Sequence, residues 1–398
     1  MSAHPAGWCQ GERSKFPMEC HTRTPGSIAL VRPGITSAFH RFHAWFKLDE
    51  SHLPPLRSPT NMPLKSATKT TSYEAVAGWA KVPHGIWLRE STAVAVDSED
   101  NVFVFNRGNW PVLKFDSQGN LLDKWGNDDP YSGFRSMQDP YGNTIAGWAG
   151  SRYKRPHGAS VDHEDNLWLV DDVGCRIYKC DRTGRVLLTI GSGVPAPKQS
   201  GNMFNKPTDV AISPDTGDIF ISDGYGNSRV HRLDKKGKHI LSWGEPGTSP
   251  GKFSLPHNLA LFDDKVIVCD RENHRVQIFT QTGEFVQEWH VHKAVSVFAG
   301  KGADRNLYIA EQGPAPVQRD VPYIGHALGI WTRSGQQVQR LGNPLPGEDA
   351  DQFLWPHSVA VDSHGDVYVA EVSYVEVGRF LTPPREMASL RKWRRVKG

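Results

Sequence analysis

The chain has 398 residues and a net charge of only +3, from 46 Lys and Arg against 43 Asp and Glu. This balance gives no electrostatic reason to expect a nucleic-acid or membrane-surface partner, and no run of 18 apolar residues predicts a membrane-spanning helix. With 38 glycines, 28 prolines and 38% hydrophobic residues, the composition favours a repetitive all-β protein over a helical one.

The N-terminal stretch, residues 1–70, is rich in Pro, Ser, Thr, Arg and His and has no sustained periodicity. We expect a disordered extension or an upstream translation artefact, with Met62 as a candidate for the true initiator. The N-terminus lacks a basic start followed by an apolar run, so a secretory signal peptide is not expected. The cysteines number five, which argues against a disulfide framework and favours a reducing, cytoplasmic setting.

From residue 72 onward, a pattern of four short alternating strands recurs about every fifty residues. The copies are 91–126, 156–191, 207–244, 256–289, a divergent one at about 294–342 and a last one from 356. Turn sequences such as DSEDN and DRTG separate the strands. A fixed period of this length predicts a six-bladed β-propeller of the NHL-repeat kind over residues 71–382.

The sixth copy lacks a fourth strand, and the segment Tyr73–Trp79 resembles the fourth strands of the other copies. We predict that this N-terminal segment completes the last blade, which closes the ring and protects its sheet edges. Residues 383–398 (PPREMASLRKWRRVKG) are basic, and a solvated C-terminal tail is expected there.

Histidine follows the anchor proline in alternate repeats, at His157, His257 and His357. The equivalent positions of the other repeats are Thr92, Thr208 and Ala294 or Val295. Because alternate blades of a six-bladed ring lie about 120° apart, the three side chains are expected to converge on the central axis. Three neutral imidazoles with an open fourth position are the ligand set of a catalytic zinc site. A structural role for three separate histidines is the alternative interpretation.

A second inner position follows the second strand of each repeat, where acidic residues are expected to cap turns or brace blades. Arg107, Arg271 and Tyr225 come just after this position. Either arginine could face the channel and bind a substrate carboxylate with two parallel hydrogen bonds. Tyr225 could supply a phenolic acid or base beside the metal. Salt bridging and packing between blades remain the alternative for all three side chains.

Three segments are distinctive: FNKPTDVAISPDTGDIFISDGYGNSRV at 204–230, LPH at 255–257 and CDRENHRVQIF at 269–279. Through them the chain resembles the peptidyl-α-hydroxyglycine α-amidating lyases, over about residues 90–372. The NHL framework alone is shared by many unrelated proteins, so the DGYGNSR and DRENHR sequences carry most of this resemblance.

The resemblance implies a catalytic Zn²⁺ ion on the three histidines, Tyr225 as the base, and Arg107 and Arg271 as catalytic arginines. It also implies cleavage of an N-acyl-α-hydroxyglycine, a small molecule or peptide-derived, into an amide and glyoxylate. Two residues depart from the family. Gly226 stands next to the tyrosine where secreted animal members have a disulfide, and Ser358 replaces an acid that binds a structural Ca²⁺, which leaves calcium in doubt.

The monooxygenase that makes the hydroxyglycine is absent from this chain, so another carbinolamide or a hydroxy acid remains open as the natural substrate. Two other functions are compatible with the fold. A non-catalytic propeller could present its loops to a protein or ligand, since fold does not fix function. A metal-dependent hydrolase or lactonase would use calcium on oxygen ligands, which the three histidines argue against.

Overall fold

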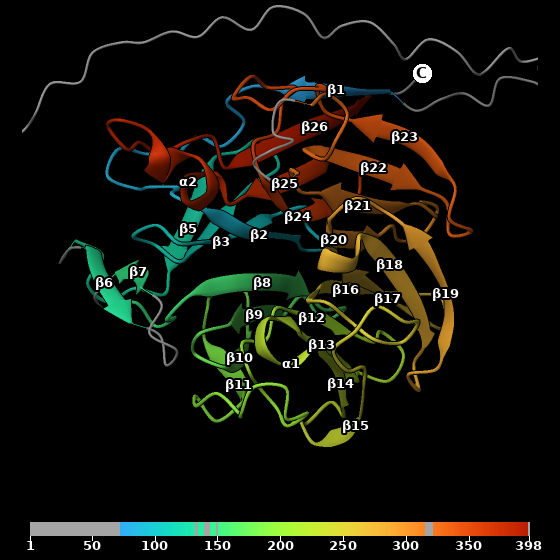
Figure 1. Ribbon diagram of the computed structural model, residues 1–398. Coiled ribbons are helices and arrows are strands. Elements are labelled where there is room, and N and C mark those ends of the chain that lie inside the picture. Colours follow the sequence, from blue (N-terminus) through green and yellow to red (C-terminus); the bar gives the residue numbers. More distant parts are fainter. Residues whose placement is uncertain (1–71, 132–133, 139–143, 149, 315–320, 397–398) are drawn as a thin grey trace, which may run out of the picture. The chain divides into compact units, whose positions relative to one another are not determined.

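The computed structural model describes residues 72–131, 134–138, 144–148, 150–314 and 321–396. Within this part of the chain, six four-stranded antiparallel sheets form the blades of a propeller (Figure 1). The inner strands contact one another in ring order, from β2 through β8, β12, β16, β20 and β24 back to β2. The predicted all-β propeller is therefore confirmed. Residues 1–70, with the candidate initiator, lie outside the described residues, and no described helix is long and apolar enough to cross a membrane.

In blades one to five the strands run outward from the channel in chain order, and in the sixth the N-terminal strand β1 is outermost. Blades one to three comprise β2 (Ser91–Val96), β3 (Val102–Asn106), β4 (Val112–Phe115), β5 (Leu121–Trp125); β8 (Pro156–Val161), β9 (Leu167–Asp171), β10 (Arg176–Cys180), β11 (Val186–Ile190); and β12 (Asp209–Ile212), β13 (Ile219–Asp223), β14 (Arg229–Leu233), β15 (His239–Trp243). Blades four to six comprise β16 (Pro256–Phe262), β17 (Lys265–Asp270), β18 (Arg275–Thr280), β19 (Phe285–His290); β20 (Ala294–Ala299), β21 (Leu307–Glu311), β22 (Ala327–Trp331), β23 (Gln337–Leu341); and β24 (Pro356–Val361), β25 (Val367–Glu371), β26 (Leu390–Val396), β1 (Ser72–Val76).

Several short elements lie outside the four-stranded sheets. They are the hairpin β6 (Phe134–Gln138) and β7 (Thr144–Trp148), the helical turns α1 (Gly224–Asn227) and α2 (Ser373–Glu376), and the 3₁₀ turns η2 (Arg271–Asn273) and η4 (Gly378–Phe380). Two of these turns, α1 and η2, directly follow the second strand of a blade, where the sequence suggested functional side chains.

The second strand of each blade is the most buried. All residues of β3, β9, β13, β21 and β25 are buried, because neighbouring blades cover both faces of the sheet. The sequences of such strands are nearly continuous apolar runs and do not alternate between apolar and polar residues. The hydrophobic clusters lie between blades: one joins Phe103 and Phe105 of the first blade to Leu167 and Leu169 of the second. Packing between blades therefore fixes the ring.

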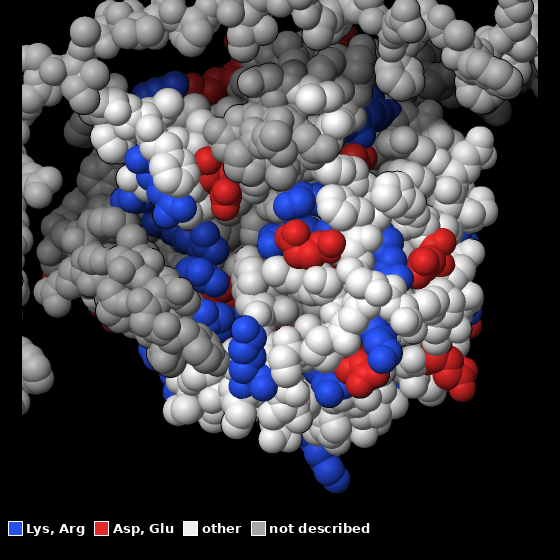
Figure 2. Space-filling view, in the orientation of Figure 1, with Lys and Arg blue, Asp and Glu red and all other residues white. Residues whose placement is uncertain are grey.

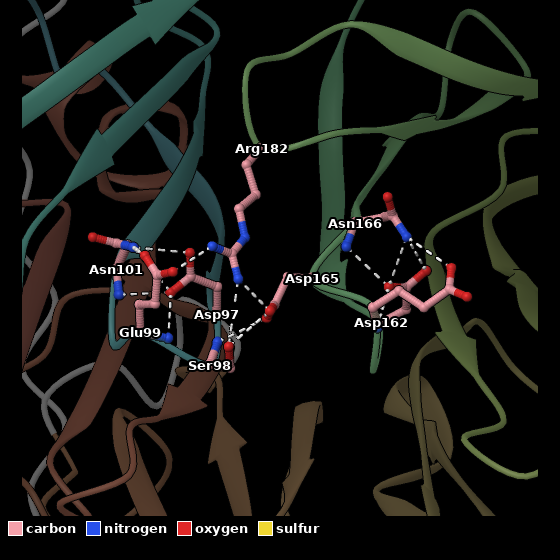
Figure 3. Close-up of polar contacts among 9 residues, drawn as sticks. Asp97, Ser98, Glu99, Asn101, Asp162, Asp165, Asn166 and Arg182 are labelled. Carbon is pink, nitrogen blue, oxygen red and sulfur yellow. Dashed lines mark hydrogen bonds and ion pairs between the residues drawn. The ribbon is translucent and has the colours of Figure 1, made fainter.

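Polar turns that join successive strands of a blade also link neighbouring blades (Figure 3). Asp165 accepts hydrogen bonds from Ser98 N and Ser98 Oγ at 2.8 and 2.7 Å. Arg182 reaches across from the second blade to Glu99, at 2.6 Å, and also contacts Asp165. Asp165 has a φ of 59°, which an aspartate tolerates better than most residues. These turns hold adjacent blades in register.

The sixth blade is closed as predicted by the N-terminal strand β1, but its third strand was not anticipated. The sequence predicted that the propeller ends at residue 382, with three strands of the last copy before that point, and that 383–398 form a solvated basic tail. Instead α2 and η4 follow β25, and β26 from that tail lies between β25 and β1. Trp393 of β26 is 6% exposed and packs into the core cluster beside Phe353.

Two basic residues of β26 have buried acidic partners, one in β25 and one directly before it, which explains why a charge count alone gave the wrong environment. Arg391 Nε lies 2.7 Å from Glu371 Oε1, and both side chains are buried. Lys392 Nζ lies 2.9 Å from Asp366 Oδ2. Each cation is thus buried together with a carboxylate, since an unpaired charge would be costly to bury.

Candidate metal centre and its channel

Buried acids at the ends of the second strands position the chain that enters the inner strands. Asp171, the last residue of β9, accepts hydrogen bonds from Lys154 N and Arg155 N at 2.8 and 2.9 Å. Glu371, the last residue of β25, holds the two residues before Pro356 in the same way, at 2.6 and 2.7 Å. In both blades the histidine follows directly after the anchored proline. These acids therefore fix the start of the strand that carries the histidine.

The three histidines predicted to converge do lie together at the channel axis. The ring centroids are 4.9 Å apart for His157 and His257, 4.8 Å for His157 and His357, and 4.7 Å for His257 and His357. One ligand nitrogen from each side chain lies within 4.8 Å of the other two. All three side chains are buried. Their near-equal spacing follows from their positions on alternate blades of the ring.

The outer nitrogen of each ring is fixed by the main chain of the following blade. Each Nδ1 atom donates to a carbonyl oxygen: His157 to Thr208 O at 2.7 Å, His257 to Val295 O at 2.8 Å, and His357 to Thr92 O at 2.6 Å. Because a carbonyl oxygen only accepts, the proton of each neutral imidazole is on Nδ1. The three Nε2 atoms are consequently left as acceptors, as in histidines that ligate metals through Nε2.

The acceptors come from the three blades that lack the histidine, at the positions which align with it in the sequence. Alternate blades thus supply the imidazole and its main-chain partner. Burial, with smaller contributions from neighbouring positive groups, lowers the pKa of His357 to about 3. Burial likewise lowers the pKa values of His157 and His257 well below the ordinary value. The rings are neutral at physiological pH, which is the protonation state that a metal ion requires.

Tyr225 lies against this cluster, at the start of α1. Its Oη atom is 2.9 Å from His157 Nε2 and 3.3 Å from His257 Nε2. The approach depends on Gly224, where a Cβ atom would lie 2.1 Å from Pro256 O. A side chain at that position would push α1 away from the fourth blade. The DGYGN sequence therefore brings a phenol to the Nε2 side of the histidines.

The two arginines predicted to face the channel line a cavity of about 450 Å³ beside the histidines. Arg107 donates to Pro156 O at 3.0 Å and to Glu90 Oε2 at 2.9 Å. Arg271 pairs with Glu272 at 2.8 Å. Both guanidinium groups are mostly buried, with 15% of each side chain exposed. Hydrogen bonds and ion pairs therefore fix two cationic groups in the cavity, at one end of the channel and on the Nε2 side of the histidine cluster.

Arg155 and Trp355 also line the cavity, and the sequence interpretation missed both. A signal was present: each stands two residues before a channel histidine, in the RPH and WPH sequences that parallel LPH at 255–257. The acids after the second strands, by contrast, brace the blades as expected and do not line this cavity. On the face that carries α1 and α2, Figure 2 shows basic side chains gathered along one side.

Fold and site together define an NHL-repeat β-propeller with a buried three-histidine cluster in its channel, and the NHL repeat model matches residues 204–233 and 253–279. The chain is homologous to the peptidyl-alpha-hydroxyglycine alpha-amidating lyases, which confirms the resemblance seen in the sequence. It is 31% identical over 352 residues to peptidyl-alpha-hydroxyglycine alpha-amidating lyase 1 of Drosophila melanogaster, a match that covers 82% of this chain and 63% of that protein.

A second relative is the peptidylglycine alpha-amidating monooxygenase of Rattus norvegicus, 30% identical over 384 residues, with 92% of this chain and 38% of that protein covered. The chain therefore spans less than two thirds of the length of both relatives. Among solved structures, a streptogramin B lyase is similar with a TM-score of 0.49 and 14% identity, over 82% of this chain and 98% of that one.

Proposed function

We propose that this protein is a zinc-dependent lyase that cleaves the C–N bond of an N-acyl-α-hydroxyglycine to an amide and glyoxylate. One observation carries the proposal: the Nε2 atoms of His157, His257 and His357 are left as acceptors around the axis, and the Tyr225 hydroxyl lies at hydrogen-bond distance from two of them. The relatives named as amidating lyases support the same class of reaction.

The donor set fits zinc. Imidazole nitrogens suit zinc, whereas calcium takes oxygen ligands. Each ring has its Nδ1 proton bonded to a carbonyl oxygen, which fixes the ring orientation before an ion arrives. Ser358, which follows the third histidine, provides no carboxylate, and its Oγ already accepts a hydrogen bond from Val94 N at 3.2 Å. We therefore propose Zn²⁺ alone, without a structural calcium at this position.

When bound, the ion would polarise the carbinolamide hydroxyl and make it more acidic, as zinc does for water. Tyr225, acting in its phenolate form, would accept that proton as the C–N bond breaks, and would return it to the departing amide nitrogen. The hydroxyl oxygen becomes the aldehyde oxygen of glyoxylate, so the reaction needs no oxidant and releases no net proton. Arg107 and Arg271 would hold the carboxylate of the glycine unit with charge-assisted hydrogen bonds.

The direct test is glyoxylate release from N-benzoyl-α-hydroxyglycine by the purified protein, before and after treatment with a chelator. Chelator-sensitive glyoxylate that returns with zinc, and does not return with calcium, is the expected result. Bound zinc without glyoxylate would retain the metal site and reject the reaction. Absence of both would favour a non-catalytic binding propeller. The zinc content of the untreated protein is measured by mass spectrometry in parallel.

A further inference from the structure

Trp355 is an aromatic side chain in the lining of the cavity, directly before β24. Its main chain is fixed twice: its N–H donates to Glu371 Oε2 at 2.7 Å, and its carbonyl oxygen accepts from Val372 N at 3.1 Å. The indole ring packs edge-on against the His326 ring, with centroids 5.5 Å apart. Both the main chain and the ring of this residue are therefore held by neighbouring groups.

A glycine of the fifth blade allows the ring to lie where it does. A Cβ atom at Gly313 would lie 2.9 Å from Trp355 Cζ3 and 2.2 Å from His326 Cε1, closer than carbon atoms approach without a shift of one of them. Only glycine leaves this space open, because it has no Cβ atom. One edge of the indole thus packs against the backbone of the fifth blade, and its position does not depend on a ligand.

The sixth blade supplies the apolar part of the cavity lining. Val372 and Val375 line the cavity together with Trp355, and all three belong to this blade or to the α2 turn within it. The basic side chains of the lining come from the first five blades. Among the residues that the structure describes, the sixth blade adds one charged group to the lining, the acid Glu376. An apolar ligand group is therefore favoured on this side, whereas a carboxylate is favoured on the other sides.

Trp355 belongs to the blade opposite the one that carries Tyr225. The third and sixth blades are three steps apart in the ring order, and so lie on opposite sides of the channel. The Tyr225 hydroxyl is accordingly within hydrogen-bond distance of His157 and His257, from the blades on either side of its own. Trp355 instead stands two residues before the third histidine, His357. A substrate whose hydroxyl is at Tyr225 therefore has the sixth blade on its other side.

We propose that Trp355 determines the acyl specificity of this site by stacking against an aromatic ring on the acyl part of the substrate. This inference rests on the proposed function and names its substrate class: N-acyl-α-hydroxyglycines whose acyl group bears an aromatic ring. Aromatic rings contribute to binding through their large apolar surface and, in addition, through the geometry of their contact. Val372 and Val375 extend the apolar surface, while Arg107 and Arg271 bind the carboxylate of the glycine unit. The two ends of the substrate are thus recognised by different chemistry.

A matched series of substrates tests the proposal: the N-acetyl, N-cyclohexylacetyl and N-phenylacetyl derivatives of α-hydroxyglycine. A methylene group separates each ring from the amide, so the intrinsic reactivity of the C–N bond is nearly the same in all of them. We expect kcat/KM for glyoxylate release to be about ten- to a hundredfold higher for the phenylacetyl than for the acetyl compound, because the ring buries apolar surface. It should exceed the cyclohexylacetyl value by about three- to tenfold, the contribution of an aromatic contact. A phenylacetyl value no higher than either of the others would overturn the inference.

Variants of Trp355 identify the residue responsible. Trp355→Leu keeps an apolar side chain but removes the aromatic ring, so the phenylacetyl and cyclohexylacetyl values should come to within about twofold of each other. Trp355→Phe keeps a ring and should retain the preference for phenylacetyl, which a purely structural role of the side chain does not predict. Trp87→Leu is the matched control, since Trp87 is 39% exposed and does not line the cavity. An unchanged phenylacetyl preference in the Trp355→Leu protein would reject the assignment.

A binding measurement separates this inference from the proposed reaction. N-phenylacetylglycine and N-cyclohexylacetylglycine lack the hydroxyl and cannot be cleaved in this way. Calorimetry should give about three- to tenfold tighter binding of the phenylacetyl compound to the parent protein, and equal binding of the two compounds to the Trp355→Leu protein. If no α-hydroxyglycine released glyoxylate but this difference held, the lyase proposal would fail and the aromatic subsite would stand. Equal binding of both compounds to the parent protein would reject the aromatic subsite, whether or not glyoxylate is released.

Discussion

Replacing Tyr225 by phenylalanine removes one oxygen atom from the candidate site and little else. The hydroxyl lies 2.9 Å from His157 Nε2 and 3.3 Å from His257 Nε2, so it is within the space where the reacting group would bind. The ring itself packs edge-on against His157, with centroids 5.1 Å apart, and this contact is retained by phenylalanine. The loss of one hydrogen bond should cost only about 1 kcal/mol of folding stability.

The effect on turnover should be far larger than the effect on stability. Loss of a positioned acid–base group lowers rates by about a hundred- to ten-thousandfold, so kcat for glyoxylate release should fall by that amount. Zinc content should not change, since the three imidazoles and their carbonyl partners are untouched.

The assay compares kcat, bound zinc and the unfolding midpoint in parent, Tyr225→Phe and Tyr323→Phe proteins. Tyr323 is 71% exposed and does not line the cavity, which makes it the matched control. A Tyr225→Phe protein with kcat within threefold of the parent would refute the assigned role. Loss of zinc together with activity would instead show that the phenol supports the metal site.

Three further outcomes are expected. Arg391→Met leaves Glu371 buried without its ion-pair partner and should destabilise the fold by about 3–5 kcal/mol, whereas Arg394→Met, at an exposed pair, should leave the midpoint of urea unfolding nearly unchanged. Below pH 6.5 the histidines of the unfolded chain bind protons, whereas the buried histidines of the folded chain do not. The free energy of unfolding of the metal-free protein should therefore fall as the pH falls. His357→Gln should make that slope shallower by about 1.4 kcal/mol per pH unit down to the folded pKa of about 3; parallel slopes would contradict the buried neutral state. Arg271→Ala should raise KM for carboxylated substrates by about ten- to a hundredfold with a smaller effect on kcat, and an unchanged KM would remove this residue from the site.

The ring of six blades could be predicted from the sequence alone. The fifty-residue period, the turn residues and the strand alternation predict four-stranded blades, because each repeat has the same local chemistry and must bury its faces against a neighbour. Histidine alternates with other residues at one aligned position of the repeats, and this was enough to predict a cluster on the axis. Each repeat forms one blade, so every second repeat is related to the next by a rotation of about 120° around that axis. The N-terminal strand of the last blade followed from its likeness to other fourth strands.

The side-chain partners across and between blades follow no sequence period, so they could be identified only in the folded chain. By composition, Trp393 and Arg391 belong to a basic tail. In the structure they lie in the third strand of the sixth blade, where Arg391 pairs with the buried Glu371. Arg155 is likewise one cation among many in the sequence. Its place in the cavity depends on Asp172 and on the close approach of α1, contacts set by how two blades pack. Local pattern fixes each strand, but the direction of a long charged side chain depends on neighbours distant in the chain, and that direction determines the chemistry of the channel.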